Sequence, residues 1–184
     1  GDYIQCGSSS DYAFGTGQFT IEFWFYNLDT NADSTQRGII QVSDAAGGLS
    51  TSYTNGWFIG TGINASSTHD NGIRFRLGDS SNNQIGGNQG TPEEWHHVAV
   101  TRDSSNVIRM FVDGVVIDSV TNAYDFTSTN LAIGGYYNTS YLTNGYLQDI
   151  RLYKGTAKYT ADFRPPIRND FLVNNITATD TFVD

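Results

Sequence analysis

The chain has 184 residues, 38% of them hydrophobic and 14% aromatic, which is sufficient for one domain with a sizeable core and leaves little room for a second. Its formal net charge of -9 repels the phosphates of nucleic acids and anionic lipids, so nucleic-acid binding is not expected. Cys6 is the only cysteine, which excludes an intrachain disulfide, and no apolar run approaches the length of a membrane-spanning segment.

Short segments of β-forming residues follow one another along the chain. The first clear one, FTIEFWFY at 19–26, alternates between two faces that both carry aromatic residues, so it predicts a central strand covered on both sides. Asp113-Gly114 lies between apolar β-formers and predicts a tight hairpin. Further strands are predicted at 38–43, 56–61, 73–77, 95–102, 107–112, 131–135 and 145–153, and only 155–162 has a sequence that could form a helical turn.

Many strands, regular turn signals and almost no helix predict an all-β sandwich or barrel. We assign residues 1–168 to this domain. Residues 169–184 are polar and aperiodic apart from an apolar group at 171–173, which indicates a linker or a C-terminal strand leading to another domain. The sequence begins without Met and in mid-pattern, so we expect it to be a segment of a longer polypeptide.

Six segments, in a fixed order, resemble a known family. They are GDYI at 1–4 with FGTGQFTIEFW at 14–24, WHHVAVTR at 95–102, FVDG at 111–114, IGG at 133–135, GYLQDIRLY at 145–153, and KGTAKYTADF with PP at 154–166. In this order they resemble laminin-G-like domains of the concanavalin A-like lectin and glucanase superfamily, and the last is similar to an ending common in phage and marine bacterial members. The resemblance implies an antiparallel two-sheet β-sandwich of the jelly-roll type. This fold carries lectins, adhesins, hydrolases and inert modules, so function must be argued from the residues.

The carboxylates and histidines do not form a catalytic pattern. A glycoside hydrolase needs clustered carboxylates, but Glu93 and Glu94 are consecutive and should face opposite sides of a strand. Glu22 stands alone between aromatic residues, where we expect it to accept a hydrogen bond within the sheet. His96 and His97 are adjacent, so they should also face opposite sides and cannot share one metal ion. We therefore expect no enzyme.

The family resemblance suggests calcium as a candidate cofactor. Related jelly rolls often hold a structural calcium between the N-terminal strand and a late strand that ends in V-R-x-Y, with an Asp two residues before the Val. Here Ile150 replaces that Val and Gln148 stands at the Asp position, so a neutral amide replaces a carboxylate. We expect no required cofactor, with Gln148 and Asp2 as the residues that would contribute if calcium were bound.

Glycan recognition needs aromatic faces for stacking on sugars, together with amides or carboxylates for the hydroxyls. The loop YYNTSY at 136–141 supplies both, through Tyr136, Tyr137, Asn138 and Tyr141. Trp57 and Asp70 are predicted to border this site. The same tyrosines could instead pack beneath their loop or against a neighbouring subunit, and both interpretations stay open at this point.

These observations lead to a main prediction and two alternatives. We predict a non-catalytic recognition or adhesion module of a larger virion or cell-surface protein, located outside the cell or on the virion, which binds surface glycans. The first alternative is a purely structural module, such as a phage capsid or tail appendage, that packs against other subunits without a small ligand. A homo-oligomer is compatible with both, and neither involves membrane insertion. A glycoside hydrolase is the third and least favoured reading.

Overall fold

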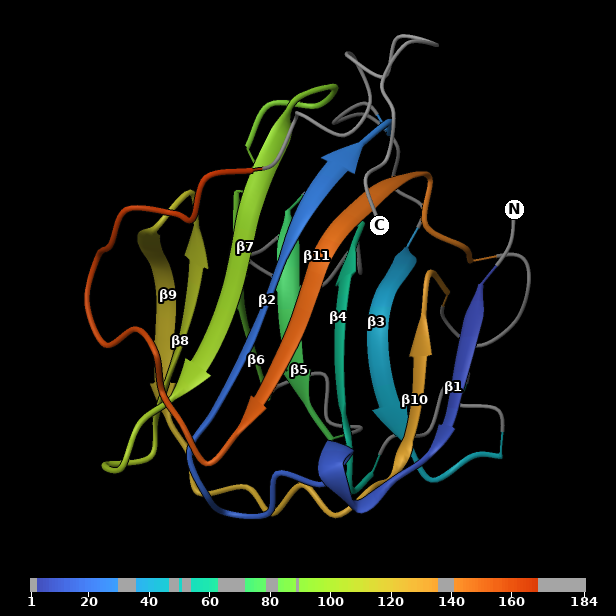
Figure 1. Ribbon diagram of the computed structural model, residues 1–184, viewed down its shortest axis with the longest axis vertical. Helices are drawn as coiled ribbons and strands as arrows, with labels where there is room; N and C mark the ends of the chain where they lie inside the picture. Colours follow the sequence, from blue (N-terminus) through green and yellow to red (C-terminus); the bar gives the residue numbers. More distant parts are fainter. Residues whose placement is uncertain are drawn as a thin grey trace, which may run out of the picture.

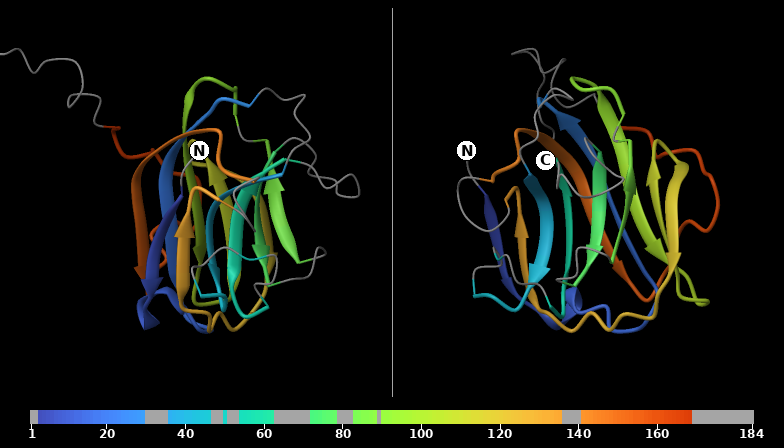
Figure 2. Two further views of the ribbon diagram at one scale, coloured as in Figure 1. Left: turned by 90° about the vertical axis from the view of Figure 1, so that its right-hand side faces the viewer. Right: turned by 180° about the vertical axis from the view of Figure 1, so that it is seen from behind.

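The computed structural model describes residues 3–29, 36–46, 50, 54–62, 72–78, 83–88, 90–135 and 141–168. These residues form two antiparallel β-sheets that pack face to face, and their one helical element is a short 3-10 turn at Ser10–Tyr12 (Figures 1 and 2). The predicted all-β sandwich is therefore confirmed. Among the residues that the structure describes, no helix has the length and apolar character needed to cross a bilayer.

The two sheets contain six and five strands. The first has the order β1 (Ile4–Ser8), β10 (Asn130–Ile133), β3 (Arg37–Ser43), β4 (Trp57–Thr61), β5 (Ile73–Leu77) and β6 (Gln84–Gly87). The second has the order β11 (Gly145–Lys154), β2 (Phe19–Asn27), β7 (Trp95–Arg102), β8 (Val107–Val112) and β9 (Val115–Thr121). The core lies between the sheets and is built from the inward residues of both.

Strand β2 is an interior strand of the five-stranded sheet, with β11 on one side and β7 on the other. Its residues Phe19, Ile21 and Phe23 have no exposed surface and belong to the core, as the alternation predicts. On the opposite face, Glu22 is also buried, although that face is the outer side of the sandwich. A further layer must therefore cover part of this outer face.

That layer is residues 155–168, which we call the C-terminal strap. It crosses the outer face of the five-stranded sheet as the orange-to-red segment in Figure 1. Thr20 Oγ1 donates to the Thr156 carbonyl at 2.8 Å, and Thr101 Oγ1 donates to the Tyr159 carbonyl at 2.8 Å. The Phe163 amide donates to the Gly114 carbonyl at 2.8 Å. The helical turn that the sequence suggested at 155–162 is absent from this described segment, because its backbone bonds to the sheet instead.

Arg102, the last residue of β7, closes one end of the core. Its guanidinium is fully buried and donates to the carbonyls of Gly15, Gly17 and Tyr124 at 2.6, 2.8 and 2.6 Å. It also lies 5.1 Å from the ring centre of Phe126. Burial lowers the pKa of Arg102 to about 10, and the nearby Asp125 charge opposes that shift. The Arg of WHHVAVTR is thus a structural residue that ties two loops to the sheet.

Candidate functional site

The C-terminal strap covers only part of the outer face of the five-stranded sheet, and the remaining part carries a row of aromatic side chains. Tyr146 of β11 pairs with Tyr26 of β2, and Tyr26 pairs with Trp95 of β7. Directly paired residues project from the same face, so the three rings form one row across three strands. We call this row the aromatic platform; it lies where β2 ends and where β7 and β11 begin, at the upper end of the sheet in Figure 1.

The rings of the platform contact one another at inclined angles. The Tyr26 ring centre lies 5.5 Å from that of Trp95 and 5.7 Å from that of Tyr146, with interplanar angles of 64° and 58°. Tyr146 is 59% exposed, while Tyr26 and Trp95 are half-buried. The platform therefore presents aromatic surface to solvent on a rigid sheet, and its rings hold each other in place.

A cation and an amide complete this surface. The Arg168 guanidinium lies 4.5 Å from the Trp95 ring centre, in the geometry of a cation–π contact. Arg168 Nη1 also donates to Gln148 Oε1 at 3.4 Å. Gln148 pairs with Trp24 in the row next to the platform, so hydrogen-bonding groups lie beside the aromatic faces.

The platform continues into the foot of the predicted tyrosine loop. The Asn144 carbonyl accepts from the Leu28 amide at 2.9 Å, and Asn144 Nδ2 donates to Asp29 Oδ1 at 2.7 Å. Asp29 also forms an ion pair with Arg37. Tyr146 lies two residues after Asn144, so the platform lies at the same end of the sandwich as residues 141–144.

The structure places the predicted ligand residues in different surroundings. Tyr141 is half-buried at the foot of its loop, and its carbonyl accepts from the Gly38 amide at 3.1 Å. Trp57 has no exposed surface and stacks on Phe14 in the core at 5.8 Å, so its ring cannot face a ligand. Its position in β4 has side chains directed into the sandwich, which corrects the expectation that it borders the site. The other predicted ligand residues, Tyr136, Tyr137, Asn138 and Asp70, lie outside the described residues.

The residues considered for calcium do not form a ligand set in the described part of the chain. Gln148 projects from the outer face of its sheet, as its pairing with Trp24 shows, and it is engaged by Arg168. β1 belongs to the other sheet, across the sandwich. Asp2 lies outside the described residues, and within them no group of three His, Cys, Asp or Glu side chains gathers around a common point. Gln148 Oε1 accepts from the Arg168 guanidinium in this arrangement, and whether calcium binds stays a prediction.

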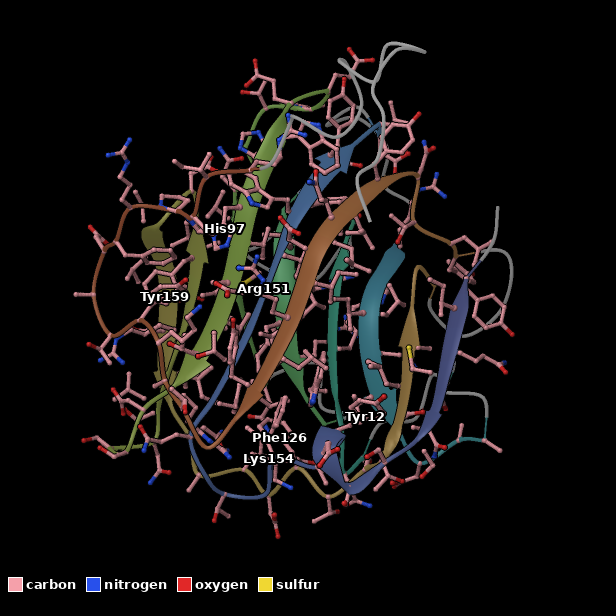
Figure 3. The ribbon with its side chains drawn as sticks, viewed as in Figure 1. Tyr12, His97, Phe126, Arg151, Lys154 and Tyr159 are labelled. Carbon is pink, nitrogen blue, oxygen red and sulfur yellow. The ribbon has the colours of Figure 1, made fainter. Side chains whose placement is uncertain are left out.

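Among the described residues, Glu22 is the one carboxylate that is buried on the outer face. Its side chain is 1% exposed and accepts from Lys158 Nζ at 2.8 Å and from the Tyr159 hydroxyl at 2.6 Å, both from the strap. His97 Nε2 and Arg151 Nη1 lie 3.6 and 3.7 Å from its oxygens. Figure 3 shows His97, Arg151 and Tyr159 on the face of the sheet turned to the viewer. The expected hydrogen bond of Glu22 is therefore present, but its shortest partners come from the strap and not from the sheet.

The environment of Glu22 suits a permanent anion. Burial by itself would raise the pKa of the Glu22 carboxyl, but hydrogen bonds from His97, Lys158 and Tyr159 outweigh burial and hold the pKa well below its usual range. Burial raises the pKa of Tyr159 to about 12, together with the hydrogen bond to Glu22 and its charge, while the Lys158 charge opposes the shift. A carboxylate that stays ionised and fully engaged beneath the strap is poorly suited to donate a proton to a leaving group.

The adjacent histidines separate as the alternation predicts. His97 pairs with Trp24 on the outer face, whereas His96 pairs with the core residue Phe25 on the inner side. His96 Nδ1 lies 2.6 Å from Asp113 Oδ2, and its Nε2 lies 2.9 Å from the Thr91 carbonyl. Both nitrogens of His96 are therefore engaged in holding the hairpin and the loop before β7.

The aromatic platform was missed by the sequence analysis. Each of Tyr26, Trp95 and Tyr146 is visible in a predicted strand, but their meeting depends on which strands are neighbours and in which register. The available signal was that residues 19–26 carry aromatic side chains on both faces, so one aromatic face had to point away from the core.

The comparisons agree with this architecture. A family model described as the concanavalin A-like lectin/glucanases superfamily matches residues 1–158, and the chain belongs to this superfamily. Curated proteins gave no match. Several solved structures have the same fold, among them botulinum neurotoxin receptor-binding domains.

The botulinum neurotoxin D receptor-binding domain superposes with a TM-score of 0.59 at 14% identity, over 85% of this chain and 39% of that one. The serotype G binding domain gives a TM-score of 0.58 at 15% identity, over 84% of this chain and 37% of that one. A structure of botulinum neurotoxin type C gives 0.54 at 18% identity, over 76% and 33%. This chain therefore spans less than two-fifths of the length of each, and at these identities the likeness concerns the fold alone.

Proposed function

We propose that this chain is a non-catalytic recognition module of a larger extracellular or virion-surface protein, and that it binds surface glycans on the aromatic platform. The observation that carries the proposal is the aligned row Tyr146, Tyr26 and Trp95, which keeps aromatic surface exposed on three adjacent strands. Aromatic rings bind the apolar faces of sugars, and a tyrosine hydroxyl can hydrogen-bond to sugar hydroxyls.

The neighbourhood of the platform supports this function. Arg168 and Gln148 lie beside the rings and offer groups that can bind sugar hydroxyls or a carboxylate on an acidic sugar. Tyr141 and the predicted residues Tyr136, Tyr137 and Asn138 belong to the loop whose foot adjoins Tyr146. We propose that these residues contribute to the same glycan site as the platform.

Two further observations favour binding over catalysis. The buried carboxylate Glu22 is sequestered beneath the strap, while Glu93 and Glu94 are exposed on a loop. Cell entry of botulinum neurotoxin type C depends on an interaction with two ganglioside molecules. Gangliosides carry oligosaccharide headgroups, so a protein that shares this fold interacts with a glycan-bearing molecule.

A glycan array probed with the full chain tests the proposal, in buffer with calcium and in buffer with a chelator. We expect binding in both conditions, because the proposed contacts are made by aromatic rings and hydrogen-bonding side chains and require no cation. Tyr146→Ala and Trp95→Ala should each weaken binding by at least about tenfold, which corresponds to ~1.4 kcal/mol. Val115→Ala, which alters an exposed apolar residue of β9, is the matched control and should bind normally. Absence of binding to any glycan, or full binding by both platform variants, would overturn the proposal.

A purely structural module remains the second candidate, because aromatic residues and Arg are also enriched at protein–protein interfaces. In that case the platform would contact another subunit of the parent assembly. Tyr146→Ala would then prevent assembly of the parent particle, while the full chain would bind no glycan on the array. Glycan binding on the array and assembly of the parent particle, measured for the full chain and for Tyr146→Ala, therefore distinguish the two functions.

A further inference from the structure

Positive charge is concentrated in one segment of this acidic protein. Residues 151–168, which comprise the end of β11 and the C-terminal strap, contain five of the ten basic residues but only one of the 19 acidic residues. Every basic residue lies in the described part of the chain, and the four exposed ones all belong to this segment: Arg151, Lys154, Lys158 and Arg164. The outer face that the strap crosses therefore has a positive character that the net charge of the chain conceals.

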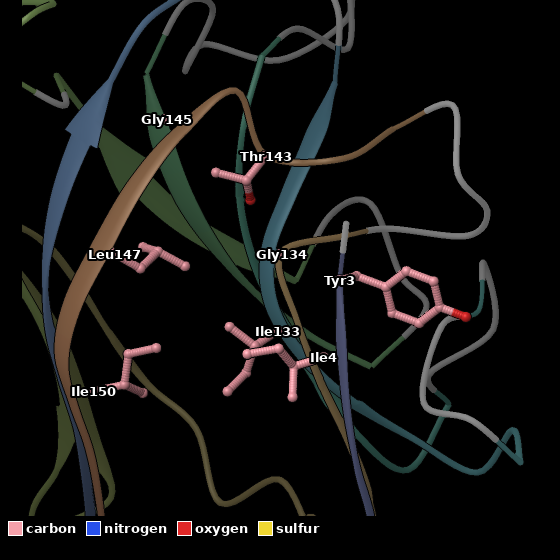
Figure 4. Close-up of a pocket in the computed structure, with 8 residues that line it drawn as sticks. All are labelled: Tyr3, Ile4, Ile133, Gly134, Thr143, Gly145, Leu147 and Ile150. Atoms are coloured by element: carbon pink, nitrogen blue, oxygen red, sulfur yellow. The ribbon is translucent and has the colours of Figure 1, made fainter. Parts of the chain in front are cut away.

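A β-bulge in β11 turns Arg151 toward this outer face. Gln148 and Arg151 both pair with outer-face residues of β2, although regular alternation would place the two positions on opposite faces. The register shifts between them, and Asp149 has a φ of 54°, in the left-handed region. Leu147 and Ile150 lie on the other side of the strand, where they line a cavity of about 320 Å³ (Figure 4). The bulge thus adds a cation to the outer face that a regular strand would not present there.

Arg151 contributes a positive charge that the buried carboxylate of Glu22 does not require. The two oxygens of Glu22 already accept hydrogen bonds from Lys158 Nζ at 2.8 Å and from the Tyr159 hydroxyl at 2.6 Å. Arg151 Nη1 lies 3.7 Å from Glu22 Oε1, which is beyond hydrogen-bonding distance, and its side chain is 43% exposed. Two cations therefore accompany one anion in this cluster, and the exposed cation is Arg151 (Figure 3).

This positive charge lies along one margin of the aromatic platform. The Arg168 guanidinium lies 4.5 Å from the Trp95 ring centre and donates to Gln148 Oε1 at 3.4 Å. Along the outer face of β11, Gln148 lies between the platform and Arg151. The exposed carboxylates Glu93–Glu94 precede Trp95 and lie at the opposite margin. An anion on the platform is therefore attracted toward the strap and repelled from the loop before β7.

We infer that the glycan bound on the platform is acidic, and that Arg151 and Arg168 bind its anionic group. This inference rests on the proposed function and specifies the class of its ligand. The group is a carboxylate or a sulfate ester carried by a sugar, since a guanidinium presents its donors in a planar fork that suits the oxygens of such groups. The aromatic rings contact the sugar, and its anionic group points toward the strap.

An array of matched glycans probed with the full chain tests the inference. Each oligosaccharide is presented in a neutral form, with a carboxylated sugar and with a sulfate ester; lactose, sialyllactose and sulfated lactose are one such set. In the sets that the chain recognises, an acidic form should bind about fivefold or more tightly than its neutral counterpart. The acidic form that gains affinity identifies the anion as carboxylate or sulfate.

The outcomes separate this inference from the proposed function. Equal binding of neutral and acidic forms, or stronger binding of neutral forms, would overturn the inference and leave glycan recognition intact. Absence of binding to every form would overturn both. The preference should also shrink as salt rises from about 0.01 M to about 1 M, because screening weakens attraction between exposed charges. A preference that does not respond to salt would contradict a role for the two arginines.

Arg151→Gln tests the assigned residue and should reduce the ratio of acidic to neutral affinity toward one. Arg164→Gln is the matched control, because it removes the same charge from an exposed strap residue whose neighbours contact Gly114 in the turn between β8 and β9. The control should keep the ratio of the parent chain. Thermal unfolding checks that the variants are folded, and Arg168→Gln is the second variant if Arg151→Gln is not. An unchanged ratio in the Arg151 or Arg168 variant, or an equal loss in the control, would contradict the inference.

Discussion

The hydroxyl of Tyr159 donates to Glu22 Oε2 at 2.6 Å and so joins the C-terminal strap to β2, an interior strand of the five-stranded sheet. Lys158 Nζ binds the other oxygen of the same carboxylate at 2.8 Å. Two consecutive strap residues therefore donate hydrogen bonds to the two oxygens of one buried carboxylate. The segment KGTAKYTADF and the sheet segment FTIEFWF therefore contribute to one ion cluster.

Glu22→Gln should destabilise the protein strongly. The substitution leaves the Lys158 ammonium without its buried counter-charge and weakens the bond from Tyr159. Removal of one partner of a buried ion pair costs roughly 3 kcal/mol or more, and we expect a loss of that size in the free energy of unfolding. Urea denaturation would measure it. Glu94→Gln, at an exposed position, should change stability by no more than about 0.5 kcal/mol, and an equal effect of both substitutions would contradict the role of the cluster.

The acid limb of the stability profile should report on Glu22. Its pKa is lowered in the folded state relative to the unfolded value of 4.5, so the stability that it contributes is present above that value. This contribution is lost as the pH falls below 4.5 toward the folded-state pKa. Denaturation midpoints measured from pH 7 to pH 2 should therefore fall less steeply in Glu22→Gln than in the parent chain. Parallel curves would show that Glu22 is not ionised in the folded protein.

An element of the fold could be predicted from the sequence where local residue patterns determine its conformation, and could not where distant residues do. Strands such as β2, β5 and β7 carry their own alternation and were predicted within a residue of their observed ends. Strand β6 was not predicted, because it has four residues, two of them glycines, and owes its conformation to pairing with β5. The sequence at 155–162 was judged able to form a helical turn, whereas the strap is held by partners far along the chain, among them Thr20 and Glu22.

In the candidate site too, the parts that are contiguous in sequence could be predicted and the parts assembled from several strands could not. The tyrosine run at 136–141 is visible as a contiguous stretch of sequence, whereas the platform is assembled from three strands whose register no local pattern specifies. Trp57 was predicted to border the site although it lies in the predicted strand at 56–61, because the sequence does not show which face of that strand points into the core.

The alkaline limb should report on Tyr159. Its pKa is raised from 10.0 to about 12 in the folded state, so its contribution is fully present below pH 10 and is lost as the pH rises through 12. The pKa of Lys158 is raised by the same carboxylate, after burial has lowered it, and acts in the same direction. Tyr159→Phe removes one titrating group and should flatten the decline in stability between pH 10 and pH 12. An unchanged alkaline decline would contradict the bond to Glu22, and Tyr3→Phe serves as the matched control at a position where no such partner exists among the described residues.

Arg102→Lys should cost roughly 3 kcal/mol of stability despite conserving the charge. The guanidinium donates to three carbonyls at once and lies over aromatic rings, whereas an ammonium cannot match this planar set of donors. Buried carbonyls left without donors add to the loss. Thermal unfolding should show a decrease of several degrees, and Arg164→Lys, on the exposed part of the strap, should leave the midpoint unchanged. A midpoint for Arg102→Lys equal to that of the parent would mean that the two loops do not depend on this residue.

Gly145→Ala should disturb the aromatic platform without altering any of its rings. A methyl group at this position would lie 2.1 Å from the carbonyl oxygen of Tyr26, so the start of β11 would have to move away from β2. Such overpacking costs roughly 1 to 3 kcal/mol, and the displacement would separate Tyr146 from Tyr26. We expect lower stability together with loss of the ring-current shifts that Tyr26 and Tyr146 impose on each other, which NMR would detect. Gly17→Ala, whose methyl group would lie 3.5 Å from the Phe14 carbonyl in ordinary contact, is the matched control. If Gly145→Ala retained both the shifts and the glycan binding of the parent chain, the close approach of β11 to β2 would not be what aligns the platform.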